Sequence, residues 1–350
     1  MIGEQISHYR LEEKLGAGTY GVVYKGVHVG DEEFTVAIKV VQPSLIDDPK
    51  FVDSLKKECR RLDRLDHSAI VRFRELVLGD DMVAMVLELL EGQDLYDTMV
   101  AGSMPFDEAA RVLELGLSGL AYAHGKDVIH RDIKPSNMFL CNDGRVKILD
   151  FGIARAAQST QATQTGTMKG TLDYMAPERF TASGGGAASD VYAMGLVAWG
   201  LLAGKPACPD GDLAAKLGWH IGVGVSDIRG VRSDCPEWLA DVIGILAAKE
   251  QSDRPADGAA ALKMFKERRA QGTQAQAQSP GTTARPAAPS TVALDQNAVA
   301  EAMRQVTDEQ QVAAPAAPTP AEVTPAASVT SAPVEAKPAV PKPLTAAVKP

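Results

Sequence analysis

The sequence predicts an α+β fold with two lobes, a small strand-rich lobe followed by a larger, mainly helical one. Apolar runs bounded by Gly, Asp or Pro predict strands over much of residues 9–90, and helical periodicity dominates after residue 94. Asp48-Pro49 predicts the start of one helix among the strands, because proline suits the first helical position. The lobes are expected to meet near residue 90.

The last part of the chain has a different composition. All Phe, Tyr and Trp residues lie at or before Phe265, whereas 12 of the 21 prolines lie in 271–350. Such a segment buries too little apolar surface to offset the entropy of ordering it. We therefore expect an N-terminal extension at 1–8, a folded region at 9–268 and a disordered tail at 269–350, which could bind an unidentified partner.

Charge and composition exclude several classes of protein. The net charge of -9 argues against a nucleic-acid binder, which normally presents a basic face. The N-terminus lacks an apolar core of signal-peptide length, and no long apolar run predicts a membrane span. The four cysteines are far apart and form no CxxC pair, which favours a reducing compartment. We expect a cytoplasmic protein.

A glycine-rich stretch lies between the first two predicted strands. It consists of Gly16, Ala17, Gly18, Thr19, Tyr20 and Gly21, with Val23 two residues further on. Glycines let a backbone turn approach phosphate oxygens closely. A dinucleotide-binding fold would need a helix next, but a strand-like run follows, so a phosphate-binding hairpin is favoured. An ordinary glycine-rich turn is the alternative.

Two charged residues are predicted to lie among apolar neighbours and to need each other. Lys39 lies within an apolar strand, and Glu58 shares a helical stripe with leucines. An unpaired carboxylate on such a face costs several kcal/mol. A Lys39–Glu58 ion pair would satisfy both, leaving the lysine to face phosphates; a lysine in this setting is otherwise usually a surface residue.

Polar residues gather again between apolar runs in the second lobe. Asp132 can accept a hydroxyl proton, Lys134 can neutralise a phosphoryl group, and Asn137 can offer an oxygen to a hard cation. Asp150 follows a predicted strand 13 residues after Asn137 and is a candidate Mg²⁺ ligand. Its alternative role is that of a turn-forming aspartate.

Together these motifs resemble the protein kinase family over about residues 9–268. The resemblance rests on GxGxxGxV, VAIK, a helical Glu, HRDxKPxN, DFG and APE in that order. It implies a bilobal kinase fold, ATP and Mg²⁺ (or Mn²⁺) as cofactors, Asp132 as catalytic base, and Asn137 and Asp150 as metal ligands. It further implies adenine contacts from Val23, Ala37, Leu87, Glu88, Leu90 and Phe139. The implied structural residues are Leu62, His130, Phe151, Glu178, Asp190 and Arg254.

Lys134 and the Lys169-Gly170-Thr171 segment resemble the serine/threonine branch, most closely the bacterial kinases of eukaryotic type, with Thr171 bridging Asp132 and Lys134. Protein substrates are therefore expected. Threonines between the DFG and APE motifs are candidates for autophosphorylation, namely Thr163, Thr165 and Thr167. The alternatives are a solvated loop with incidental threonines, and, for the whole chain, a nucleotide-binding pseudokinase or a small-molecule kinase.

Overall fold

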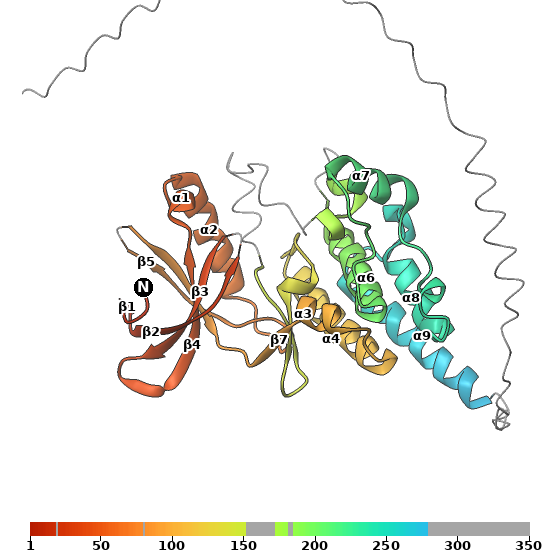
Figure 1. Ribbon diagram of the computed structural model, residues 1–350, viewed down its shortest axis with the longest axis horizontal. Coiled ribbons are helices and arrows are strands. Elements are labelled where there is room, and N and C mark those ends of the chain that lie inside the picture. The colour runs from red at the N-terminus through yellow and green to blue at the C-terminus, as the bar shows by residue number, and fades with distance from the viewer. Residues whose placement is uncertain (19, 80, 152–171, 181–184, 279–350) are drawn as a thin grey trace, which may run out of the picture. The chain divides into compact units, whose positions relative to one another are not determined.

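The computed structural model describes residues 1–18, 20–79, 81–151, 172–180 and 185–278. Within them the chain forms a strand-rich lobe at one end and a helical lobe at the other, with a short second sheet between (Figure 1). The predicted α+β class is confirmed. Several predicted residues lie outside the described ranges, namely Thr19, Thr163, Thr165, Thr167, Thr171 and the tail from residue 279.

The N-terminal lobe contains a six-stranded antiparallel sheet in the order β1-β2-β3-β4-β6-β5. Its strands are β1 (Gln5–Ile6), β2 (Tyr9–Gly18), β3 (Gly21–His28), β4 (Asp31–Val41), β5 (Phe73–Leu78) and β6 (Val83–Glu88), and its helices are α1 (Pro43–Ile46) and α2 (Pro49–Leu62). Ile6 is buried, so the expected N-terminal extension contributes a strand to this sheet.

The glycine hairpin between β2 and β3 needs glycine at its closing position. A Cβ added at Gly21 would lie 2.0 Å from the carbonyl oxygen of Val40 on β4. No side chain fits at that distance, so the close approach of the two backbones explains the third glycine of the motif.

Helix α2 begins where the sequence predicts. The Asp48 side chain accepts a hydrogen bond from the backbone N–H of Lys50 at 2.9 Å, and Pro49 occupies the first position. Phe51 and Leu55 are buried in a cluster that includes residues of β5 and β6. Glu58 lies on the same buried face, so α2 carries its carboxylate into the lobe.

The C-terminal lobe is mainly helical. Its helices are α3 (Leu95–Ala101), α4 (Phe106–His124), α6 (Ala187–Ala203), α7 (Leu213–Gly218), α8 (Glu237–Leu246) and α9 (Gly258–Gln278). Its antiparallel sheet joins β7 (Gly92–Asp94), β8 (Met138–Cys141) and β9 (Val146–Ile148). Single turns are η1 (Pro135–Asn137), η2 (Leu172–Tyr174), η3 (Pro177–Phe180), η5 (Ile228–Gly230), η6 (Gln251–Asp253) and the π-helical turn η4 (Trp219–Val223).

Helix α6 is the centre of this lobe. It is buried along almost its whole length and packs against α3, α4, α8 and α9. Gly204 ends it with a left-handed φ of 71°, a conformation that favours glycine. Because α6 is held on several sides, its first turn provides a fixed position for Asp190.

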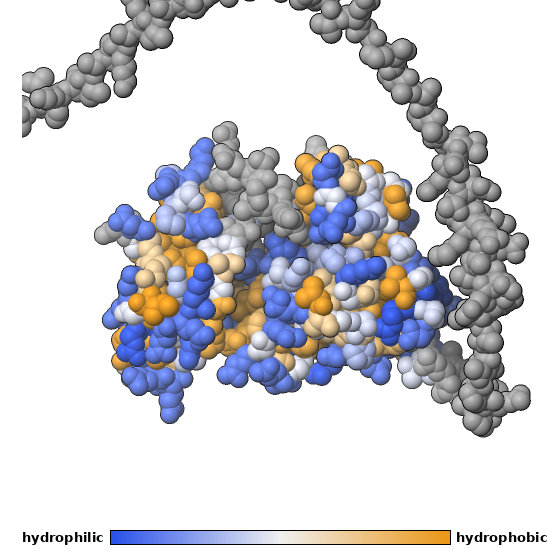
Figure 2. Space-filling model, in the orientation of Figure 1, coloured by the Kyte–Doolittle hydropathy of each residue, from blue (hydrophilic) through white to orange (hydrophobic). Residues whose placement is uncertain are grey.

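The last helix and the surface show two further features. Helix α9 continues to Gln278, past residue 268 where the folded region was expected to end, because the added Ala and Gln residues favour helix. No helix within the described ranges combines the length and apolar character needed to cross a bilayer. Polar and apolar side chains are interspersed over the face drawn in Figure 2.

Candidate active site

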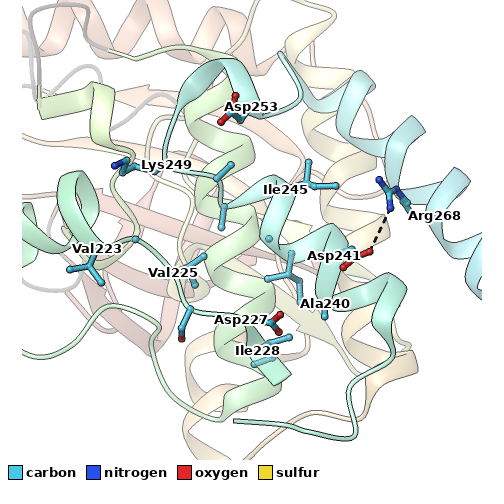
Figure 3. A pocket seen from close by; sticks show the side chains of 16 residues that line it. Val223, Val225, Asp227, Ile228, Ala240, Asp241, Ile245, Lys249, Asp253 and Arg268 are labelled. Carbon is cyan, nitrogen blue, oxygen red and sulfur yellow. Dashed lines mark ion pairs between the residues drawn. The ribbon is translucent and has the colours of Figure 1, made fainter. Parts of the chain in front are cut away.

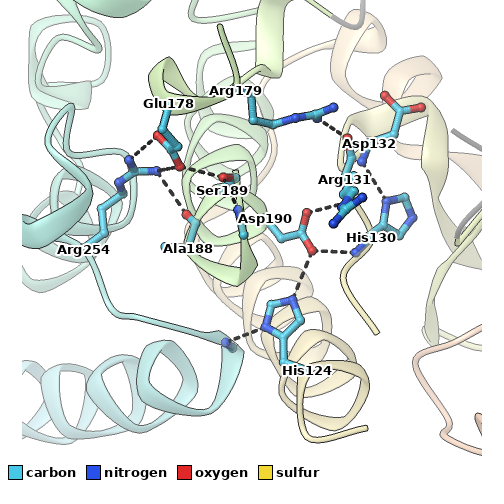
Figure 4. A network of polar contacts seen from close by, with 12 residues as sticks. His124, His130, Arg131, Asp132, Glu178, Arg179, Ala188, Ser189, Asp190 and Arg254 are labelled. Atoms are coloured by element: carbon cyan, nitrogen blue, oxygen red, sulfur yellow. Dashed lines mark hydrogen bonds and ion pairs between the residues drawn. The ribbon is translucent and has the colours of Figure 1, made fainter. Parts of the chain in front are cut away.

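The loop between α4 and β8 is anchored by Asp190, at the start of α6 (Figure 4). The Asp190 carboxylate accepts hydrogen bonds from the backbone N–H groups of His130 at 2.7 Å and Arg131 at 2.8 Å, and lies 3.1 Å from Nε2 of His124. Burial raises the pKa of Asp190, but the hydrogen bonds from His124 and from the backbone N–H of Arg131 help to hold that pKa below its usual range. Asp190 thus anchors the backbone of this loop.

Arg131 has a left-handed φ of 68°, which is uncommon for a residue with a side chain. The two hydrogen bonds to Asp190 fix the peptide groups before the Cα of Arg131, and Arg179 donates to the carbonyl oxygen that follows it. Asp132 follows directly, so its direction is set by this anchored turn.

Asp132 is buried between two donors. Its Oδ2 atom lies 2.8 Å from Nζ of Lys134 and 2.9 Å from Nδ2 of Asn137. Its Oδ1 atom is also buried, and has no hydrogen-bond partner among the residues that the structure describes. A buried acceptor of this kind is costly unless something donates to it, so Oδ1 is positioned to accept a hydrogen from a bound hydroxyl.

Lys39 and Asp150 bring the two lobes together. Nζ of Lys39, on β4, lies 2.6 Å from Oδ2 of Asp150, which follows β9. Asp150 has a φ of 57°, and its side chain is 26% exposed. Burial raises the pKa of Asp150, but the Lys39 ammonium outweighs this and keeps the pKa below its usual range.

The expected ion pair between Lys39 and Glu58 is not formed, and that prediction was wrong for this structure. Glu58 is buried on α2 and pairs instead with Arg61, one turn further along the same helix. The need of each charge for a partner was inferred correctly. The choice of partner was not, because Arg61 can reach Glu58 within α2 while Lys39 meets the carboxylate of Asp150.

Asn137 and Asp150 form a donor set suited to a hard cation. Asn137 donates through Nδ2 to the carbonyl oxygen and to Oδ2 of Asp132, which leaves its amide oxygen as the atom available to a metal. Within the described part of the chain no group of three or more His, Cys, Asp or Glu could enclose a metal ion. One carboxylate and one amide oxygen fit Mg²⁺ shared with phosphate oxygens, rather than a cation enclosed by protein alone.

The predicted adenine contacts come from both lobes: Val23, Ala37 and Leu87 lie on β3, β4 and β6, Leu90 follows β6, and Phe139 lies on β8. Ala37 on β4 pairs in register with Leu87 on β6, and both side chains are partly exposed. Ile38, the next residue after Ala37, faces the core instead. Val23, Leu90 and Phe139 are partly exposed as well. Apolar side chains left open on the strands are suited to a flat aromatic ligand.

The side chain of Glu88 is held within the protein, and its expected contact with adenine stays a prediction. Its backbone N–H donates to Arg72, and its carboxylate pairs with the buried Lys147 of β9. The side chain is therefore occupied within the protein, so a contact of Glu88 with a nucleobase would have to come from its backbone.

Two further predicted contacts lie in the C-terminal lobe. The rings of His130 and Phe151 are 4.5 Å apart, edge to face, and Leu62 packs against the same core. Arg254 Nη2 lies 2.7 Å from Oε2 of Glu178 (Figure 4). Burial raises the pKa of Glu178, but hydrogen bonds from Arg254 and Ser189 outweigh it and lower the pKa.

Sequence reasoning missed three residues near the site. His124 joins Asp190 to α9, because its Nδ1 accepts from the N–H of Gly258 at 2.9 Å. Arg179 donates to the carbonyl oxygen of Arg131, which joins η3 to the anchored loop. Of the three, only Lys147 could have been found from the sequence, because it is a lysine between apolar residues of a short predicted strand, as Lys39 is.

A cavity of about 590 Å³ lies elsewhere in the C-terminal lobe, between α8, α9 and residues 223–228 (Figure 3). Its described lining includes Asp241 and Arg268, which pair at 3.6 Å, and none of the predicted site residues. This cavity is therefore separate from the predicted site, which is defined by the chemistry of its side chains.

The protein kinase domain model matches residues 9–266, and the chain belongs to the protein kinase family. The crystal structure of the Mycobacterium tuberculosis PknI kinase domain has the same fold, with a TM-score of 0.60 at 24% identity over 77% of this chain and 99% of that one. The fold and the ordered motifs thus agree with the resemblance inferred from the sequence.

Named relatives come from bacteria. The serine/threonine-protein kinase PknL of Mycobacterium tuberculosis is 31% identical over 256 residues, which are 73% of this chain and 64% of PknL. The serine/threonine-protein kinase PrkC of Bacillus subtilis is 33% identical over 260 residues, 73% of this chain and 39% of PrkC. The chain therefore matches less than two thirds of these relatives.

Proposed function

We propose that this chain is a serine/threonine protein kinase that transfers the γ-phosphoryl group of ATP to hydroxyls on proteins. The observation that carries the proposal is the Asp132 carboxylate, whose Oδ2 is held by Lys134 and Asn137 while its buried Oδ1 has no hydrogen-bond partner among the described residues. Lys39, Asp132 and Asp150 are all present, which disfavours a pseudokinase. The names of the bacterial relatives and the presence of Lys134 support serine and threonine as acceptors.

In the proposed reaction the protein acts mainly by positioning and by charge. Asp132 orients the acceptor hydroxyl and accepts its proton, and Lys134 offsets negative charge on the transferring group. Lys39 holds the nucleotide phosphates. Mg²⁺, held by Asp150 and Asn137, would supply further charge neutralisation between the phosphates. Glycine hairpin N–H groups and the apolar strand residues would hold the nucleotide.

Three expectations remain predictions. They are the bridging role of Thr171, autophosphorylation at Thr163, Thr165 or Thr167, and a partner for the tail. All of these residues lie outside the described ranges. Cytoplasmic location is inferred from composition alone. Mass spectrometry of the ATP-treated chain tests the threonines, and an unmodified 159–171 peptide from an active sample would reject autophosphorylation there.

Radiolabel transfer from ATP to a generic basic protein tests the function. Asp132→Asn keeps size and one acceptor but removes the base, so transfer should fall by about 10²- to 10⁴-fold. Equal incorporation by wild type and variant would assign the activity to a contaminant.

A further inference from the structure

The segment before the APE motif is held by two buried side chains that no motif includes. Lys216, on α7, pairs with Asp173 of η2, and only 9% of the lysine side chain is exposed. His220, in the π-helical turn η4, is fully buried, and its Nε2 lies 2.8 Å from the carbonyl oxygen of Leu172. Both contacts therefore reach η2 from the same neighbouring part of the chain.

The hydrogen bonds of His220 fix its tautomer. Nε2 donates to the Leu172 carbonyl, so Nδ1 is the acceptor and receives the hydroxyl of Tyr192, on α6, at 2.8 Å. Burial lowers the pKa of His220 to about 4, so the ring is neutral near pH 7. The ring thus joins η2 to α6, the most buried helix of the lobe, and both of its nitrogens are used.

The local geometry of η4 serves this contact. A π-helical turn is rare and often marks a functional position. Here it follows α7 directly, and Trp219 packs edge to face on His220 with ring centroids 4.7 Å apart. The turn directs His220 inward, while Val223 at its end is 80% exposed.

Segment η2 lies where an acceptor peptide must bind. A protein substrate has to bring its hydroxyl to Asp132, so the residues flanking that hydroxyl contact whatever borders the anchored loop. Segment 172–180 borders it, because Arg179 donates to the carbonyl oxygen of Arg131, the residue before Asp132. The position of η2 therefore affects how the peptide is held.

We propose that Lys216 and His220 are positioning residues that hold Leu172–Tyr174 as the surface for the peptide around the acceptor hydroxyl. They set the affinity for protein acceptors and not for ATP. Lys216 also neutralises Asp173, so the surface does not select basic residues beside the hydroxyl. This inference rests on the proposed function.

The test uses the full chain and two synthetic peptides, each with one serine, flanked by alanines in one and by arginines in the other. His220→Ala should raise the peptide KM about tenfold, since a buried hydrogen bond is lost, and leave the ATP KM within about twofold. In His220→Gln the amide nitrogen can still donate to Leu172, so the peptide KM and the ATP KM should both stay within about twofold of the wild-type values.

Lys216→Met should increase the preference for the arginine peptide, an effect that simple loss of structure cannot produce. It leaves the Asp173 charge uncompensated, so the ratio of kcat/KM for the arginine peptide over the alanine peptide should rise about tenfold. Lys266→Met, an exposed change on α9, should leave that ratio unchanged. If His220→Ala is not recovered folded, His220→Gln and Lys216→Met carry the test.

The outcomes separate this inference from the proposed function. A wild-type chain that phosphorylates neither peptide nor any protein overturns the proposed function itself. An active wild type overturns the inference alone if the KM values for ATP and peptide rise together in His220→Ala, or if Lys216→Met leaves the peptide ratio unchanged.

Discussion

Two groups of buried charges behave differently in this protein. Around Asp190 the carboxylate is held by two backbone N–H groups and by His124. Around Lys39 the partners are exchanged, because Lys39 pairs with Asp150 and Glu58 with Arg61. The first group lies within one lobe and the second joins elements of both.

The difference shows which polar contacts a fold determines. Backbone donors at 130 and 131 cannot move without unfolding the loop, so the Asp190 carboxylate has fixed partners. Lys39 and Glu58 carry long side chains that any nearby opposite charge can satisfy. We therefore expect the first group to determine stability and the second to determine activity.

Removing Asp190 should have the largest effect on stability. Asp190→Ala leaves two buried N–H groups without an acceptor, which should lower the free energy of unfolding by about 3–5 kcal/mol. Asp190→Asn keeps one oxygen acceptor and should cost less. Urea denaturation followed by circular dichroism measures both, and equal stability of Asp190→Ala and wild type would contradict the comparison.

Changing Lys39 should affect activity instead. Lys39→Met removes a charge aimed at the phosphates, so kcat/KM for phosphoryl transfer should fall by about 10²- to 10³-fold. The free energy of unfolding should change little, because the Asp150 side chain is 26% exposed and water can reach it. A loss of stability as large as that of Asp190→Ala would show that both groups are structural.

The sequence predicted the elements and most of the site, and its errors have a common cause. Asp48-Pro49 predicted the start of α2, and the ordered motifs singled out Asp132, Asn137, Asp190, Glu178 and Arg254, which the structure brings into the contacts described above. Each of these lies in a fixed local setting. The Lys39–Glu58 pairing failed because spacing along the chain identifies charges that need partners but does not rank several partners within reach.

His124, Arg179 and His220 could not be found from the sequence for a related reason. Each donates to, or accepts from, a backbone group far along the chain, and backbone partners leave no residue-type pattern. Strand β1 was missed because two residues are too few for a detectable alternation.

Acid should weaken the Glu178–Arg254 pair of the same lobe in a predictable direction. The pKa of Glu178 is lowered in the folded chain, so the unfolded chain binds more protons as the pH falls through the carboxyl range near about 4. The stabilisation is present above that range and lost below it. Glu178→Gln should therefore lose less stability than wild type between pH 7 and pH 4.

The matched control is Glu237→Gln, an exposed change at the start of α8 that should retain the wild-type pH profile. Urea midpoints at several pH values measure both variants. If the urea midpoints of Glu178→Gln and wild type fall in parallel with pH, Glu178 does not contribute to the loss of stability in acid.

The smallest expected effect tests whether Arg61 and Lys39 compete for the carboxylate of Glu58. Arg61→Met removes one partner of Glu58, and helical pairs at this spacing contribute about 0.2–0.5 kcal/mol, so the ATP KM should fall by only about twofold because the Glu58 carboxylate then attracts Lys39 more strongly. Arg60→Met, an exposed change on the same turn of α2, should leave KM unchanged. The double variant Arg61→Met/Glu58→Gln should lose the gain, because Lys39 then has no second carboxylate to adopt. If Arg61→Met alone raises KM, Arg61 supports the site rather than competing for it, and the partners around Lys39 are as fixed as those around Asp190.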